Sequence, residues 1–76
     1  MIDEAFAKVL RELRVSKGFS QESLAQEVGI HRTYVSQLER GLKSPSLKTL
    51  YKIAYVLEVP LSEIMTLIEK QQEKKD

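Results

Sequence analysis

The sequence predicts an all-α fold in which five helices pack into one compact domain. Apolar residues recur three and four positions apart along most of the chain, and glycine or proline stands between the apolar segments. A chain of 76 residues is long enough for a single core, so we treat residues 1–76 as one domain. A domain of this size buries only roughly 60% of the surface that its unfolded chain exposes, and we expect modest stability.

The first expected helix spans about Asp3 to Lys17 and ends at Gly18. The residues on its apolar face are Phe6, Val9, Leu10 and Leu13. A second helix follows at Gln21, because the hydroxyl of Ser20 can accept hydrogen bonds from the free amides of the first turn. Two helices are therefore expected before residue 29.

Residues 21–40 contain two short amphipathic segments on either side of Gly29. Glycine accepts the positive φ that often follows a helix end, and a third helix can then run from about Arg32 to Arg40. The apolar residues that would face inward are Leu24, Ala25, Val28, Ile30, Val35 and Leu38. Ala25 is small where two steeply crossed helices would approach most closely. This pattern is typical of a helix-turn-helix, the motif that presents its second helix to the major groove of DNA.

The last two helices are separated by Pro60. The fourth spans about Leu47 to Leu57, with Ser46 as its N-cap after the loop at Pro45. Its expected inward face consists of Leu47, Leu50, Ile53, Ala54 and Leu57. The fifth spans residues 61–71, and the polar residues 72–76, four of them charged, are expected to fray.

The chain resembles the helix-turn-helix domains of Cro and the phage repressors in three strings: FSQESLAQEVGI, RTYVSQLERG and SPSLKTL. The resemblance extends from about Phe6 to Ile64. The stretch HRTYVSQLERG is also similar to the small controller proteins of bacterial restriction-modification systems. The resemblance implies a lambda-repressor-like DNA-binding domain, a transcriptional regulator that binds double-stranded DNA, and autoregulation.

Positive charge is concentrated around the third expected helix. Residues 31–55 contain five lysines and arginines against one glutamate, whereas the whole chain has a net charge of only +1. A surface that faces phosphates needs its positive charge in this place. An ordinary solvated helix surface is the alternative explanation.

Four residues of the third helix are candidates for reading bases: Arg32, Thr33, Ser36 and Gln37. Residues at the start of such a helix, and one turn later, reach base edges in the major groove. Arg32 can donate two hydrogen bonds to guanine, Gln37 can pair with adenine, and Thr33 can contact thymine. The alternative for Arg32 and Gln37 is a plain surface role, although an arginine at a helix N-terminus opposes the helix dipole.

Five residues are candidates for contacts to the DNA backbone: Gln21, Tyr34, Lys43, Ser44 and Lys48. Gln21 begins the second helix, where backbone amides attract anions, and Lys43 and Ser44 follow the third helix. The alternative for Tyr34 is a half-buried support of the third helix, and that for Lys48 is a solvated charge. The resemblance also implies that Arg14 pairs with Glu39 and holds the third helix against the first. His31 is interpreted as a cap or surface residue.

Dimerisation is expected because one short helix reads about half of a useful operator. A twofold axis would place two recognition helices about 34 Å apart, one turn of DNA. The candidate contacts are Ile64, Leu67 and Ile68 on the last helix, with Met65 and Tyr55 as possible neighbours. Ile64 is also the first choice for closing the core of the domain. Burial in that core is likewise the alternative for Leu67 and Ile68.

No catalytic site, cofactor, metal or small-molecule ligand is predicted. The chain has no cysteine and one histidine, and it has no glycine-rich phosphate loop. Its N-terminal segment lacks the long apolar run of a signal peptide, and no stretch has membrane-spanning length, so a cytoplasmic protein is expected. The leading hypothesis is a dimeric regulator on an inverted-repeat operator. The alternatives are a phage-type repressor and an antitoxin-like module that binds another protein.

Overall fold

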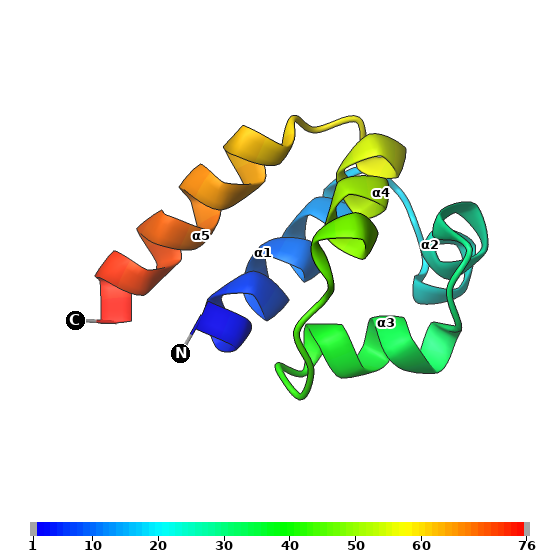
Figure 1. Cartoon of the computed structure of the whole chain (residues 1–76), viewed down its shortest axis with the longest axis horizontal. Coiled ribbons are helices and arrows are strands. Elements are labelled where there is room, and N and C mark those ends of the chain that lie inside the picture. Colours follow the sequence, from blue (N-terminus) through cyan, green and yellow to red (C-terminus); the bar gives the residue numbers. More distant parts are fainter. Residues whose placement is uncertain (1, 76) are drawn as a thin grey trace.

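Residues 2–75, the part of the chain that the computed structural model describes, form five helices and no strand (Figure 1). The helices are α1 (Ile2–Ser16), α2 (Gln21–Val28), α3 (Arg32–Glu39), α4 (Leu47–Leu57) and α5 (Leu61–Lys75). The all-α fold class predicted from the sequence is therefore confirmed, and the five helices occur in the expected order, although some of their ends differ.

Helix α1 packs against both α3 and α5, while α2 packs against α3 and α4 (Figure 1). The expected inward residues of α1, α2 and α3 lie in one core, with Leu13 and Ile30 packed at its edge. The largest fully buried side chains come from all five helices: Leu10, Leu24, Val35, Leu38, Ile53, Leu57 and Ile64. The position of α3 is thus set by core contacts on its inner side.

The turn between α2 and α3 has the predicted geometry. Gly29 ends α2 with φ 86° and ψ 35°, and the amide of Ile30 donates to the carbonyl of Ala25 at 2.9 Å. Ala25 is 2% exposed, as close helix packing requires. At the other end of α2, Ser20 and Ser23 form a capping box in which each side chain accepts from the backbone amide of the other. Both ends of this short helix are therefore fixed by local hydrogen bonds.

The end of α3 is fixed by its contact with α1. The helix stops at Glu39, one residue before the predicted end, and Gly41 follows with φ 72°. A β-carbon at Gly41 would lie 3.6 Å from the α-carbon of Glu4, so the backbone here runs close to the start of α1. The chain then turns into the loop that leads to α4.

Two features of α4 and α5 differ from the expectation. Leu47 is 74% exposed rather than part of the inner face of α4, because it is the first residue of the helix and the core does not extend over it. Helix α5 continues to Lys75, since residues 72–75 are strong helix formers and contain neither glycine nor proline. That this segment frays stays a prediction, and Asp76 lies outside the described residues.

The residues proposed for a dimer contact do not form a free surface. Ile64 and Ile68 are 1% and 3% exposed and belong to the core, and Leu67 is half-buried against it. Side chains already buried within one copy have little area left for a second copy. The assignment of Ile64 and Ile68 to a dimer interface is therefore replaced by a core assignment, which closes α5 onto α1.

Candidate DNA-binding surface

Helix α3 has a buried side and an open side. Val35 and Leu38 are 1% and 0% exposed, and they face the core. On the other side Arg32 and Thr33 are exposed, whereas Ser36 and Gln37 are half-buried. Arg32 and Ser36 lie one turn apart along the helix, as do Thr33 and Gln37. The four candidate base-reading residues therefore lie on the same side of α3.

The start of α3 lacks a side-chain cap. His31 has the extended backbone of an N-cap residue, with φ −77° and ψ 145°, but its side chain makes no capping hydrogen bond. Its ring is exposed, in agreement with the surface role expected for it. The first-turn amides of α3 consequently do not receive the hydroxyl acceptor that Ser20 provides for α2.

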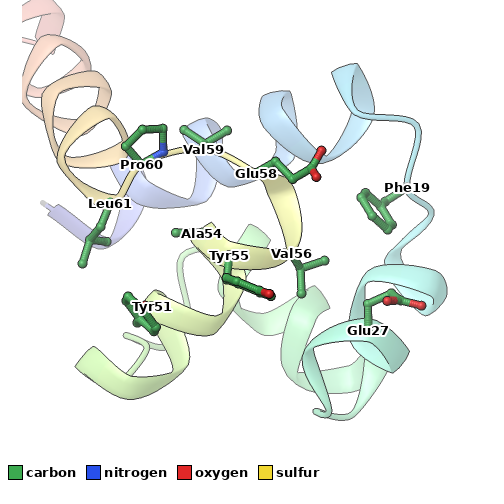
Figure 2. A pocket seen from close by; sticks show the side chains of 10 residues that line it. All are labelled: Phe19, Glu27, Tyr51, Ala54, Tyr55, Val56, Glu58, Val59, Pro60 and Leu61. Carbon is green, nitrogen blue, oxygen red and sulfur yellow. The ribbon is translucent and has the colours of Figure 1, made fainter.

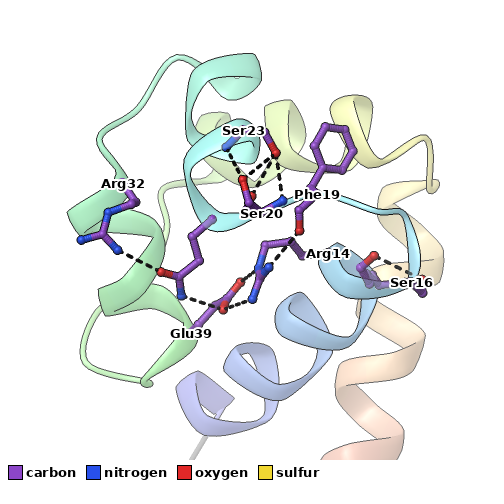
Figure 3. A network of polar contacts seen from close by, with 9 residues as sticks. Arg14, Ser16, Phe19, Ser20, Ser23, Arg32 and Glu39 are labelled. Carbon is purple, nitrogen blue, oxygen red and sulfur yellow. Dashed lines mark hydrogen bonds and ion pairs between the residues drawn. The ribbon is translucent and has the colours of Figure 1, made fainter.

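The ion pair implied by the family resemblance is present between α1 and α3. Arg14 Nε and Nη2 donate to the two carboxylate oxygens of Glu39 at 2.6 Å and 3.1 Å, and Nη1 donates to the carbonyl of Phe19 at 2.9 Å (Figure 3). The side chains of Arg14 and Glu39 are only 12% and 4% exposed. Such a bidentate, shielded pair fixes both the distance and the angle between α1 and α3.

Gln21 connects this ion pair to Arg32. Its Nε2 donates to Glu39 at 3.1 Å, and its Oε1 accepts from Arg32 Nη1 at 3.3 Å (Figure 3). The sequence assigned Gln21 to a phosphate and Arg32 to a base, but it did not indicate their mutual contact. The two residues are 11 positions apart on separate helices, so only the angle set at Gly29 brings them together.

The remaining backbone candidates lie around the end of α3. Lys43, Ser44 and Lys48 are all exposed. The ring of Tyr34 packs against the core, and its hydroxyl is 3.5 Å from the carbonyl of Ser44, at the long limit for a hydrogen bond. The hydroxyl of Ser44 donates to the carboxylate of Asp3. The structure therefore supports a packing role for the Tyr34 ring and ties the following loop to α1.

A second surface, on α4 and the start of α5, is apolar. Leu47, Tyr51 and Tyr55 occur at every fourth position of α4 and are 74%, 62% and 78% exposed. Tyr51 and Tyr55 line an open groove together with Pro60 and Leu61 (Figure 2). Met65, one turn along α5, is 37% exposed. We call Leu47, Tyr51, Tyr55, Leu61 and Met65 the tyrosine surface.

The described part of the chain contains neither a cluster of metal-ligating residues nor a membrane-spanning helix. Within residues 2–75 no group of three or more histidine, cysteine, aspartate or glutamate residues is placed to hold a metal ion. Among the described helices, none is both long and apolar enough to cross a membrane.

Comparison with known proteins identifies the same motif and similar small proteins. A family model described as "Helix-turn-helix" matches residues 10–64. The control protein C.BamHI of Bacillus amyloliquefaciens is 40% identical over 73 residues, which cover 92% of this chain and 90% of that protein. The control protein C.MunI of a Mycoplasma species is 42% identical over 67 residues, covering 87% of this chain and 90% of the relative.

Solved structures show the same similarity. The restriction-modification controller protein C.AhdI of Aeromonas hydrophila superposes with a TM-score of 0.79 at 42% identity, covering 82% of this chain and 94% of that one. The controller protein C.Esp1396I, solved as a tetramer in complex with its natural 35-base-pair operator, has a TM-score of 0.84 at 30% identity, with 93% of each chain covered.

Proposed function

This chain belongs to the helix-turn-helix family, and we propose that it is a sequence-specific DNA-binding transcriptional regulator that acts as a dimer on an inverted-repeat operator. The observation that carries the proposal is the open side of α3, where Arg32 and Thr33 are exposed while the opposite side is held in the core. In proteins with this motif the second helix enters the major groove and its first residues contact base edges. The proposed function is therefore DNA binding and not catalysis. We place this activity in the cytoplasm.

The roles of individual side chains follow from their chemistry and exposure. Arg32 would donate two hydrogen bonds to a guanine, and Thr33 would offer its methyl group to a thymine. Ser36 and Gln37 would approach the next base pairs, Gln37 by pairing with adenine. Half-burial of these two side chains limits their reach, so we assign the larger part of base discrimination to Arg32.

Phosphate contacts would surround this helix. Lys43 and Lys48 contribute exposed positive charge, and Ser44 would contribute a hydroxyl after releasing its hydrogen bond to Asp3. The hydroxyl of Tyr34 has only a long contact to Ser44, so it can turn towards a phosphate without losing a strong bond. Such contacts fix the register of a protein on the duplex without reading its sequence.

The second copy would bind at the tyrosine surface. This surface replaces the interface predicted from Ile64 and Ile68, because four of its five side chains are exposed in the single chain and Leu61 is half-buried. The half-buried Leu67 stays a candidate contact. Two large tyrosine rings can bury much apolar area, and burial of such area gives about 25 cal/mol per Å² before the cost of association is subtracted. A solved relative forms a tetramer on its operator, which supports assembly on DNA.

The most specific version of the proposal is a controller of a restriction-modification system. Two similar curated proteins are named as control proteins, and each is covered over about nine-tenths of its length. A regulator of this kind would respond to its own concentration through dimerisation. A phage-type repressor of the same fold is the alternative within the family.

A binding assay tests the proposal. Fluorescence anisotropy with duplex DNA should show one preferred operator bound at about 10 nM or tighter, and affinity should fall steeply as salt is raised. Weak, sequence-independent binding to every duplex, together with tight binding to a protein partner, would instead favour an antitoxin-like interaction module. The tyrosine surface would then contact that partner.

A further inference from the structure

The groove beside the tyrosine surface is negatively charged. Glu27 of α2 and Glu58 at the end of α4 line it together with Tyr51 and Tyr55, and its lining within the described residues includes no lysine or arginine (Figure 2). Both glutamates are exposed, and no side chain among residues 2–75 pairs with the carboxylate of Glu58. A protein that covers this groove must therefore bring a cation, because a carboxylate that loses water without gaining a partner weakens binding.

The backbone of Glu58 has an unusual conformation for its residue type. Glu58 ends α4 in the left-handed region, with φ 58° and ψ 41°. The other described residues with positive φ are all glycines, namely Gly18, Gly29 and Gly41. A side chain in this conformation destabilises the fold, and glycine would avoid that strain. Strain of this kind points to a use of the side chain outside the fold.

A twofold axis determines which residue would lie opposite Glu58 in a dimer. An axis perpendicular to α4 makes the α4 helices of the two copies antiparallel, and every contact then occurs twice. The exposed rings of Tyr51 and Tyr55 are the natural centre of such a contact, each packed against the other ring of the second copy. The residue three positions before Tyr51 then lies opposite the residue three positions after Tyr55. These residues are Lys48 and Glu58.

We propose that Glu58 forms an ion pair with Lys48 of the second copy, and that this pair fixes the register in which the two tyrosine surfaces meet. The inference rests on the proposed dimer. Lys48 is exposed in the first turn of α4, and it too has no carboxylate partner among the described residues. A parallel arrangement of the two helices would oppose lysine to lysine and glutamate to glutamate. The two charges therefore select the antiparallel register.

This role differs from the phosphate contact proposed for Lys48. A phosphate contact requires DNA, whereas the ion pair acts between two copies of the protein in solution. Self-association measured without DNA therefore separates the two roles.

The first test measures the dimer dissociation constant of charge variants by analytical ultracentrifugation without DNA. We expect Glu58→Lys to weaken self-association about 30-fold or more, because both ion pairs become like-charge contacts. Lys48→Glu should have a similar effect. The variant that combines both changes restores the two pairs in reverse order, so its dissociation constant should return to within about threefold of the original.

Lys52→Glu provides the matched control, because Lys52 is an exposed lysine one turn along the same helix. Combined with Glu58→Lys, it should not restore the dimer. Equal recovery with Lys52→Glu and with Lys48→Glu would show a diffuse attraction between charges and would overturn the proposed register.

The second test uses Glu58→Gly, which should have opposite effects on the dimer and on the single chain. Glycine removes the ion pair but relieves the left-handed strain. We expect self-association to weaken about three- to thirtyfold. In the monomeric Tyr55→Asp background, the same change should raise the melting temperature by about 4 °C. A rise in melting temperature with unchanged self-association would show that Glu58 is only a helix end, and would overturn the proposal.

Failure of the ion pair and failure of the proposed dimer give different results. If Tyr55→Asp leaves the dimer intact, the tyrosine surface is not the interface, and the proposed dimer fails first. If Tyr55→Asp dissociates the dimer while Glu58→Lys and Lys48→Glu leave its dissociation constant unchanged, only the ion pair fails.

Discussion

The open side of α3 and the tyrosine surface differ in how their exposed side chains are held. At α3 the exposed Arg32 is linked by hydrogen bonds to the shielded pair of Arg14 and Glu39. On α4, Tyr51 and Tyr55 are 62% and 78% exposed and offer apolar area instead. A surface that reads bases needs donors in fixed positions, whereas a surface that binds a second protein gains free energy by burying area.

This difference implies that the two surfaces can be impaired separately. Substitutions on the open side of α3 should change which DNA is bound and how salt affects binding. Those on the tyrosine surface should change the oligomeric state and, through it, the affinity for a two-part operator. The ion pair between α1 and α3 is the exception, because it supports both the fold and the position of α3.

The largest effect is expected for Glu39→Ala. It leaves the shielded guanidinium of Arg14 without a carboxylate and removes the acceptor of Gln21. Removing one partner of such a pair should lower the free energy of unfolding by about 3 kcal/mol, measured by urea denaturation without DNA. The control is Glu12→Ala, at an exposed position on α1. Equal denaturation midpoints for the two variants would show that the pair does not hold the helices together.

The next largest effect is expected for Tyr55→Asp. A carboxylate at the centre of the tyrosine surface would have to be desolvated when two copies meet, so the dimer should dissociate. We expect a monomer in analytical ultracentrifugation and a loss of operator affinity of about 100-fold or more, since one copy makes only half of the phosphate and base contacts.

Val15→Asp is the matched control for that variant, because Val15 is an apolar residue 59% exposed on α1, away from the tyrosine surface. It should leave the sedimentation coefficient and the operator affinity unchanged. If Tyr55→Asp remains a dimer and Val15→Asp does not, the dimer interface lies elsewhere.

A smaller effect is expected for Arg32→Ala. Loss of a bidentate contact to guanine should cost about 1 to 3 kcal/mol at one operator position and leave preferences at the other positions intact. Competition with duplexes that carry single base-pair changes measures this. A uniform loss on every duplex would remove Arg32 from base readout and assign it to the phosphates.

The smallest effect is expected for Lys43→Ala. An exposed lysine that meets a phosphate should weaken binding to all sequences by a similar factor and reduce the salt dependence by about one unit. The measurement is the slope of log affinity against log salt concentration. An unchanged slope would show that Lys43 is solvated in the complex.

Much of the fold was predictable because local signals agreed with one another. Apolar spacing placed the core residues of α1, α2 and α3, and the glycine at position 29 indicated the turn that the structure contains. Leu47 was misassigned because spacing alone does not show where the core ends along a helix. The end of α5 was misplaced because no residue type in that segment stops a helix.

The candidate site was predictable one residue at a time. Exposure of Arg32 and Thr33 agrees with the roles predicted for them, and the pair of Arg14 with Glu39 came from the family resemblance. The contact between Gln21 and Arg32 was missed because it depends on the angle between two helices. The free area on α4 was only partly predicted, since Tyr55 and Met65 were named as neighbours of the dimer contact and not as its main residues. A sequence does not reveal which of several apolar residues the core will use first.

Dimeric, sequence-specific binding is tested most directly by selecting bound sites from a pool of random duplexes with the full chain. We expect an enriched inverted repeat whose two half-site centres lie about 10 base pairs, or a multiple of this, apart. Repeating the selection with Arg32→Ala should lose the preference at one base pair in each half-site. Enrichment of a single unrepeated half-site, or of no motif at all, would contradict the dimeric, sequence-specific regulator proposed above.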